Sequence, residues 1–263
     1  MESLDQQIEQ VADLVAKSEK IIFFTGAGVS TESGIPDFRG PDGIWNKIDH
    51  EDLYIDRFLS DSNVRKMHWE FFIGGALNMT QYQPNPAHYA IAELEKMGKL
   101  YGVVTQNVDG LHQKAGVSEN MVFQLHGDGS HATCLSCTTR YAMEEIIEWM
   151  AKDKDLDEPK CAACKGMLKP DAVFFGEQLP WGVLMESEKR SRSCDLCIVL
   201  GSSLVVYPAA MIPQYAQQGG AKLVIINMGP TEMDRLADIR IDAKAGEVTP
   251  RILERAKEKM GDG

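Results

Sequence analysis

The sequence predicts an α/β protein in which a doubly wound, mostly parallel sheet carries a smaller inserted lobe. Three observations predict this fold: short apolar runs typical of buried strands, helically spaced stretches between them, and two polar segments that interrupt the alternation. Strands of a parallel sheet are buried on both faces, so they are expected as continuous apolar runs. A chain of 263 residues can form one large domain together with a small one.

Strands and helices are expected to alternate along most of the chain. The first helix is indicated by Leu4, Ile8 and Val11, which are spaced three or four residues apart. The expected strands are 21–24, 100–105, 122–125, 196–200 and 223–226, and the expected helices are 2–18, 63–80, 86–98, 208–218 and 231–237. In a sheet of this kind, ligands bind at the carboxyl ends of the strands.

Two segments lack this alternation and are expected to form the small lobe. Residues 41–85 are helical and irregular with no obvious strand, whereas 130–168 are polar and contain cysteines. The predicted division gives 1–44, 86–129 and 169–263 to the sheet domain. It gives 45–85 to a helical module and 130–168 to a zinc-ribbon module.

The composition of the chain argues against several classes of protein. The formal net charge of −12 opposes binding to nucleic acid, which depends on lysine and arginine at the phosphates. The acidity either attracts cationic partners such as lysine-rich peptides or simply keeps the protein soluble. The N-terminus lacks the basic start and apolar stretch of a signal peptide, and no apolar run approaches the roughly 20 residues needed to span a membrane. A cytoplasmic protein is expected.

Four cysteines predict a structural zinc site. Cys134 and Cys137 form one Cys-x-x-Cys pair, and Cys161 and Cys164 form a second. Two such pairs can close one tetrahedral site, and four thiolates leave no open position for catalysis. His131 is an alternative ligand. A third pair, at 194 and 197, enters an apolar strand and is more typical of small buried side chains.

A glycine-rich loop follows the first predicted strand. Gly26, Ala27 and Gly28 would let the backbone approach a pyrophosphate, with the amides of a helix N-terminus facing it. The third glycine of the usual dinucleotide motif comes late, at Gly34, so an ordinary turn is the alternative. Further along, Asp37 and Arg39 flank Phe38, an arrangement expected of a mobile cover over a ligand.

Polar side chains leave the ends of other predicted strands. Gln106, Asn107 and Asp109 follow one strand closely, either as ligand-binding groups or as an Asx turn that caps the next helix. His112 is expected to be structural. His126 follows the strand at 122–125 and is the candidate proton acceptor, because an imidazole titrates near neutrality.

Several motifs together resemble the sirtuin family. They are GAGVSTESGIPDFRG, TQNVDGLHQKAG, LHG, the paired CxxC motifs, PDAVFFGEQLP, GSSLVVYPAA and INMGPTEMDRLAD, from about residue 20 to 245. The resemblance implies a Rossmann-like NAD-binding domain, a small lobe with structural Zn2+, and NAD-dependent removal of acyl groups from protein lysines. The products would be nicotinamide, O-acyl-ADP-ribose and free lysine.

The resemblance also implies roles for individual residues. His126 would be the general base, with Asn107 beside it. The NAD-binding residues would be Gly26, Ala27, Gly28, Asp37, Phe38, Arg39, Gln106, Asn107, Val108, Asp109, Gly201, Ser202, Ser203 and Asn227. An extended acyl-lysine peptide would lie between strands formed by Val173, Phe174, Phe175, Gly176, Glu177, Val205, Val206 and Tyr207.

One departure bears on the acyl group. Sirtuins that prefer succinyl or malonyl lysine carry a Tyr-x-x-Arg pair, and the aligned positions here are Phe72 and Gly75. Without an arginine to pair with a buried carboxylate, acidic acyl groups should be poor substrates. Two other functions remain as alternatives: a mono-ADP-ribosyltransferase, and a non-catalytic module that binds NAD or uses zinc for interactions.

Overall fold

A six-stranded parallel sheet forms the larger part of the molecule. The computed structural model describes residues 2–38, 40, 43, 48–74, 78–152 and 158–261. The strand order is β3-β2-β1-β7-β8-β9, and each neighbouring pair is parallel. The strands are β1 (Ile21–Thr25), β2 (Leu100–Thr105), β3 (Val122–Gln124), β7 (Leu196–Leu200), β8 (Lys222–Ile226) and β9 (Ile239–Ile241). The predicted parallel α/β sheet is confirmed.

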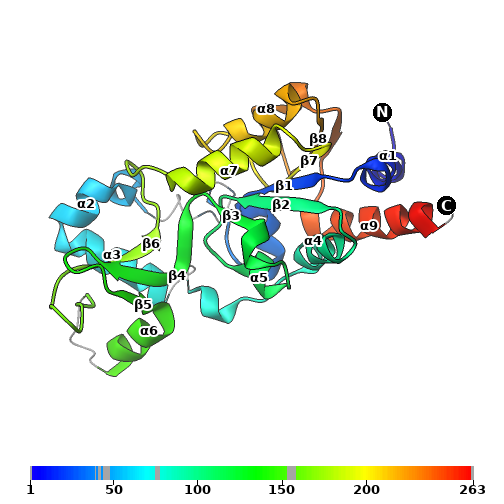
Figure 1. Cartoon of the computed structure of the whole chain (residues 1–263). Coiled ribbons are helices and arrows are strands. Elements are labelled where there is room, and N and C mark those ends of the chain that lie inside the picture. The colour runs from blue at the N-terminus through cyan, green and yellow to red at the C-terminus, as the bar shows by residue number, and fades with distance from the viewer. Residues whose placement is uncertain are drawn as a thin grey trace.

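Helices cover both faces of this sheet, as Figure 1 shows. One face packs against α1 (Leu4–Lys17), α4 (Pro86–Lys96) and α9 (Ala245–Gly261). The other packs against α7 (Trp181–Ser191) and α8 (Met211–Gln218). Alternate residues of β1 lie in the apolar cores on the two faces of the sheet: Phe23 lies in the first core and Phe24 in the second. This two-sided burial explains why the strands are continuous apolar runs.

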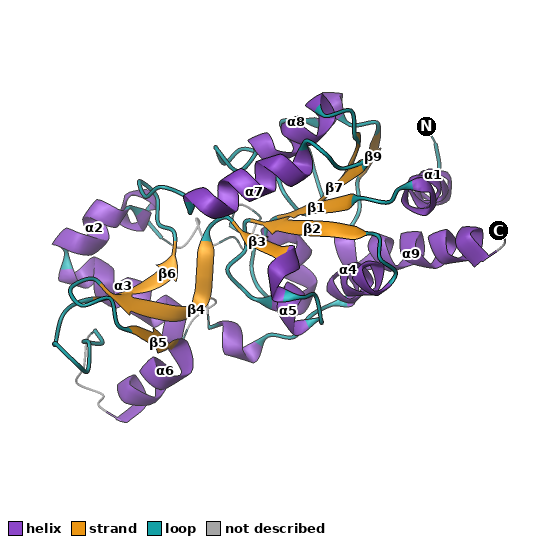
Figure 2. Ribbon diagram, viewed as in Figure 1, coloured by secondary structure: helices purple, strands orange, loops and turns teal. Residues whose placement is uncertain are grey.

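The small lobe has a different architecture, visible at the left of Figure 2. Its three-stranded antiparallel sheet has the order β5-β4-β6. The strands are β4 (Gly127–Cys134), β5 (Arg140–Ala142) and β6 (Leu168–Ala172), and the helices are α2 (Ile55–Ser60), α3 (Ser62–Ile73) and α6 (Met143–Lys152). Phe58, Trp69 and Ile146 are fully buried between them.

Several sequence-based expectations were wrong in detail. The segment 231–237 has only a 3-10 turn, Asp234–Leu236, because Asp234 accepts hydrogen bonds from the backbone and hydroxyl of Thr231 and fixes a turn. The helix expected over 63–80 ends at Ile73, before Gly74. The strands of the small lobe, β9, α7 and the long α9 were not anticipated. The domain boundaries given above stay a prediction.

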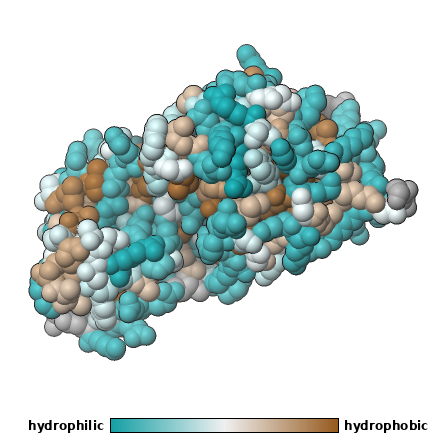
Figure 3. Space-filling model, in the orientation of Figure 1, coloured by the Kyte–Doolittle hydropathy of each residue, from teal (hydrophilic) through white to brown (hydrophobic). Residues whose placement is uncertain are grey.

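In the part of the chain that the structure describes, every helix is too short or too polar to cross a lipid bilayer. The surface in Figure 3 is mostly polar, and apolar side chains gather on the small lobe and near its junction with the sheet domain.

Candidate active site

The loops that leave β1, β2 and β7 meet at one edge of the parallel sheet. Gly26 N donates to Leu200 O at 3.1 Å, and Gln106 N donates to Thr25 O at 2.9 Å. The Gln106 side chain joins two of these loops, since its Nε2 donates to Ser202 Oγ at 2.9 Å. Between β1 and β7 the strand order reverses direction, and this is the point where doubly wound sheets bind ligands.

The glycines of the first loop allow it to pack directly on the loop after β7. Gly28 N donates to Gly201 O at 2.9 Å, and a Cβ atom on Gly26 would lie 2.7 Å from that same oxygen. Gly201 itself has a φ of 61°. The helix expected after β1 is a short 3-10 helix, Ala27–Val29, and a second, Thr31–Ser33, follows it. Within the first of these helices, Ala27 and Gly28 are partly exposed, whereas Val29 is buried.

His126 lies two residues beyond β3, with its ring directed by the neighbouring loop. Its Nδ1 is 2.9 Å from Gln106 O, and a carbonyl can only accept, so Nδ1 carries the proton and Nε2 is the basic nitrogen. Among the described residues, Nε2 has no hydrogen-bond partner, and the side chain is partly exposed. Burial lowers the pKa of His126, and the hydrogen bond to the Gln106 carbonyl opposes this shift. The imidazole is therefore neutral at pH 7.

Asn107 and Asp109 form a buried polar group with Ser30, which sequence analysis missed. Asp109 Oδ2 accepts from Ser30 Oγ at 2.7 Å and from Asn107 Nδ2 at 3.1 Å. Asp109 Oδ1 accepts from Leu111 N at 2.9 Å, so the Asx turn considered above is also present. Ser30 lies within the glycine loop, and no spacing in the sequence connects it to a carboxylate 79 residues away.

Two buried histidines lie behind this group. His112 Nε2 is 3.0 Å from Thr25 Oγ1, and its ring is 4.9 Å from that of His88. Burial holds the pKa of His112 well below its usual range, with His88 adding to the shift, and burial also lowers the pKa of His88 to about 4. The expectation that His112 is structural fits these contacts, whereas His88 was not singled out.

The other predicted NAD residues lie in separate loops. Asn227 follows β8, and its Nδ2 donates to Met228 O and Gly229 O at 3.0 and 3.1 Å. Asp37 accepts from Gly40 N at 2.7 Å, and the neighbouring Phe38 ring is exposed. Arg39 lies outside the described residues.

The two predicted peptide-binding segments differ in how much of them is accessible. Phe174 is buried, and its ring stacks on His68 at 4.6 Å. Both the N–H and the C=O of Phe175 bond to the small lobe, to Leu53 O and Ile55 N. Gly176 is exposed, and among the described residues its backbone has no hydrogen-bond partner. In the second predicted segment, Val205 and Tyr207 are exposed.

Four cysteines converge at the tip of the small lobe. Their sulfur atoms all lie within 4.8 Å of one another: Cys134, Cys137, Cys161 and Cys164. The two pairs form matching turns, in which Thr138 N donates to Cys134 O and Lys165 N donates to Cys161 O. Four thiolates at this spacing fit tetrahedral Zn2+, with each zinc–sulfur bond about 2.3 Å.

Two further side chains were considered at this site. His131 is not part of the sulfur cluster, because its Nδ1 lies 2.7 Å from Asp128 Oδ2. Cys194 and Cys197 are buried away from it, and burial raises the pKa of both thiols. These two cysteines behave as the small buried side chains that the sequence indicated.

The sequence of this chain matches those of known proteins over most of its length. A family model described as the Sir2 family matches residues 26–208, which include the glycine loop, His126 and all four clustered cysteines. The chain belongs to the Sir2 family. It is 44% identical over 251 residues to NAD-dependent protein deacetylase 1 of Pyrobaculum aerophilum, with 95% of each chain covered.

Other Sir2 proteins give the same result. The chain is 44% identical over 256 residues to NAD-dependent protein deacylase 2 of Archaeoglobus fulgidus, covering 97% of this chain and 98% of that one. A solved complex of Sir2 with a p53 peptide and NAD+ has a TM-score of 0.86 at 38% identity, over 95% of this chain and 99% of the other. The whole catalytic fold of this Sir2 protein is therefore shared with its relatives.

Proposed function

We propose that this Sir2 protein is an NAD-dependent protein-lysine deacylase. The reaction would transfer an acyl group from lysine to ADP-ribose and give nicotinamide, O-acyl-ADP-ribose and free lysine. The observation that carries the proposal is the neutral His126 imidazole, whose Nε2 is without a partner among the described residues at the edge where the β1, β2 and β7 loops meet. The names of the relatives agree with it.

We propose that NAD binds over the carboxyl edge of the parallel sheet. The residues present fit a dinucleotide, because Gly26, Gly28 and Gly201 let the loops after β1 and β7 pack closely together at the sheet edge, and Asn107 and Asp109 supply buried polar groups beside them. Ser202, Ser203 and Asn227 would hold the adenosine half. When bound, NAD supplies an electrophilic sugar carbon whose leaving group is nicotinamide.

In this proposal His126 is the general base. Its Nδ1–H stays fixed on the Gln106 carbonyl, so Nε2 can take a proton from a sugar hydroxyl. The lowered pKa favours the neutral ring that a general base requires. Asn107 would orient the substrate, because its Nδ2 is held by Gly26 O and Ser30 Oγ, each at 3.2 Å. Holding the reacting groups in place lowers the entropic part of the barrier.

We propose that the acyl-lysine peptide pairs with Gly176 on one side and with Val205 to Tyr207 on the other. Support comes from the exposed Gly176 and from the exposed side chains of Val205 and Tyr207. Acidic acyl groups should be disfavoured, because Phe72 is a buried apolar side chain that cannot pair with a carboxylate. Gly75 lies outside the described residues. A cytoplasmic location is favoured, because none of the six cysteines is paired in a disulfide.

The proposed function can be tested by replacing His126, the general base. In His126→Ala, deacylation of an acetyl-lysine peptide in the presence of NAD should fall by about 10² to 10⁴-fold, because general-base assistance is lost. His131→Ala is the matched control, since His131 bonds to Asp128, away from the sheet edge, and should keep wild-type activity. Mass spectrometry would follow the product, and circular dichroism the fold.

Two results would contradict the proposal. One is turnover by His126→Ala within tenfold of the wild type, and the other is deacylation that continues without NAD. Release of nicotinamide without an acylated peptide would favour ADP-ribosyl transfer instead. Succinyl-lysine peptides should react much more slowly than acetyl-lysine peptides, and equal rates would refute the argument from Phe72.

A further inference from the structure

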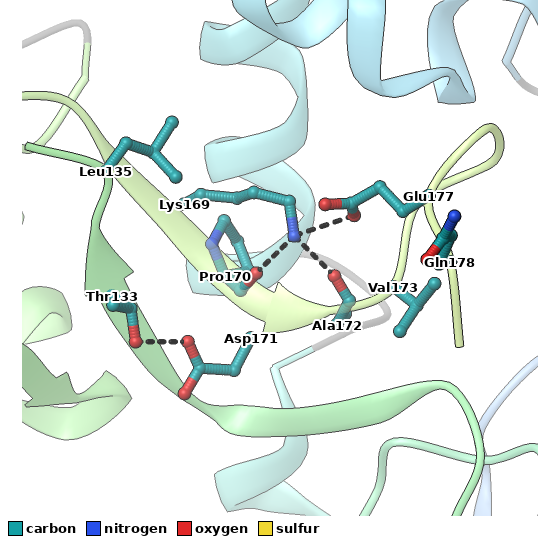
Figure 4. Close-up of a pocket in the computed structure, with 9 residues that line it drawn as sticks. All are labelled: Thr133, Leu135, Lys169, Pro170, Asp171, Ala172, Val173, Glu177 and Gln178. Atoms are coloured by element: carbon teal, nitrogen blue, oxygen red, sulfur yellow. Dashed lines mark hydrogen bonds and ion pairs between the residues drawn. The ribbon is translucent and has the colours of Figure 1, made fainter. Parts of the chain in front are cut away.

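A buried lysine contacts the turn that we assign to peptide binding. Lys169, in β6, is 8% exposed, and Figure 4 shows its ammonium enclosed by three oxygen acceptors. Nζ lies 3.1 Å from Pro170 O, 2.8 Å from Ala172 O and 2.9 Å from Glu177 Oε2. A lysine ammonium has three donors, and these three oxygens can use all of them. The same nitrogen is 4.4 Å from the centre of the Phe174 ring.

The partner of this lysine closes the turn that would face the substrate. Glu177 Oε2 also accepts a hydrogen bond from Phe174 N at 2.7 Å, and Glu177 N donates to Phe174 O at 3.1 Å. Between them lies Gly176, with a φ of 84°. One carboxylate oxygen therefore joins the lysine to both ends of the turn. This fixes the direction of the Gly176 backbone.

The lysine acts at a distance from the reacting groups. Among the described residues, no hydrogen bond or ion pair joins Lys169 or Glu177 to the loops after β1 and β7 that we assign to NAD. The turn follows Val173, whose N–H donates to His126 O at 2.8 Å, and this backbone bond links it to the catalytic loop. Loss of the lysine should thus affect the peptide site first and leave the NAD site intact.

We propose that Lys169 is a positioning residue that, through Glu177, holds the turn at 174–177 in the conformation that binds the acyl-lysine peptide. This inference rests on the proposed deacylase function. A turn that is already ordered loses less conformational entropy when an extended peptide pairs with it, so the lysine improves peptide affinity without touching the peptide. Its removal leaves the carboxylate of Glu177 without its cation and frees the turn to take other shapes.

The experiment compares three variants of the full chain. Lys169→Met keeps the length of the side chain and removes its charge, Lys169→Arg keeps the charge, and Glu177→Gln keeps an acceptor for Phe174 N but removes the ion pair. Lys189→Met is the matched control, because Lys189 is an exposed lysine paired with Glu186 in α7. Steady-state kinetics would give kcat and both KM values, with NAD and an acetyl-lysine peptide varied in turn.

Lys169→Met and Glu177→Gln should each raise the peptide KM at least about tenfold, with the KM for NAD changed less than about twofold. Lys169→Arg should recover most of the peptide affinity, and Lys189→Met should match the wild type. If circular dichroism shows that Lys169→Met is unfolded, Glu177→Gln decides by the same criterion.

Other outcomes overturn the inference. An unchanged peptide KM, or a fall in kcat alone, would mean that Lys169 does not position the peptide site. An equal rise of the KM for NAD would indicate a general structural role. No NAD-dependent turnover by the wild type would contradict the proposed function itself, whereas wild-type turnover with an unchanged peptide KM in the variants contradicts only the role of Lys169.

Discussion

The sheet domain and the small lobe reach stable structures by different means. The sheet domain buries two faces of a parallel sheet under helices, with separate apolar cores on the two sides. Among its described residues, the small lobe has one apolar core, a three-stranded sheet and four clustered cysteines. A small unit buries too little apolar surface to be stable alone, and a bound metal ion supplies what is missing. The sheet domain should therefore stay folded when the metal is removed, whereas the small lobe should unfold.

Removing zinc should have the largest effect on stability. It should unfold the small lobe and leave the sheet domain folded. Chelation, or Cys137→Ser together with Cys164→Ser, is expected to unfold the small lobe and abolish deacylation, because the folding free energy of such lobes includes metal binding. Hydrogen exchange followed by mass spectrometry should show loss of protection over 127–172. Protection of β1, β2, β7 and β8 should persist.

Metal analysis of the wild type provides the control, with one zinc expected for each chain. Uniform loss of protection in both regions on chelation would show that they unfold as one unit. That result would contradict the expectation that only the small lobe depends on metal for its folding.

The next largest effect should come from the backbone contact at the sheet edge. Gly201→Ala is expected to destabilise the protein by about 3 kcal/mol or more, because a Cβ there would lie 2.2 Å from Val29 N and the φ of 61° disfavours alanine. Urea unfolding would measure the loss. Gly182→Ala is the control, since a Cβ at Gly182 meets no atom within 4 Å. Equal stabilities of the two variants would contradict the packing argument.

Acid should weaken the sheet domain through its buried histidines. The pKa of His88 is lowered from 6.5 to about 4 by burial, so the unfolded chain binds more protons between these pH values. Its stabilising contribution is complete above about pH 6.5 and is lost as the pH falls towards 4, by about 2 kcal/mol between pH 7 and pH 5. Urea unfolding at both pH values would measure this change.

His88→Gln should have a shallower dependence on pH than the wild type. Because both proteins contain the same cysteine cluster, the comparison cancels any effect of acid on metal binding. Parallel pH profiles for the two proteins would show that His88 does not carry the effect.

The smallest effect is expected at an exposed ion-pair network on the small lobe. Arg140 lies 2.6 Å from Asp171 Oδ2 and 2.9 Å from Asp128 Oδ2, but half of its side chain is exposed. Exposed pairs contribute little, so Arg140→Gln should cost about 0.5 kcal/mol. Thermal unfolding of the metal-bound protein would detect it. A loss above about 2 kcal/mol would mean that this network, as well as the metal, supports the lobe.

Sequence patterns predicted the parts of the protein that depend on local spacing. Five apolar runs predicted strands of the parallel sheet, and the structure places β2 and β7 at the expected residues. Two Cys-x-x-Cys pairs predicted a cluster that the structure confirms. The strands of the small lobe were missed because β4 and β6 contain glycine, proline and charged residues, which lack the apolar alternation of an ordinary strand.

By itself, the sequence determined the class of fold, the metal ligands and the strand ends where polar groups gather. All of these follow from the period of apolar residues and the spacing of ligand side chains, which are local properties of a chain. Tertiary structure alone decided that Ser30 bonds to Asp109, that His126 Nδ1 bonds to the Gln106 carbonyl, and that Lys169 supports the turn at 174–177. The first two pairings join loops that follow different strands of the parallel sheet, so they form only once that sheet has assembled. The third depends on how the chain folds back after β6.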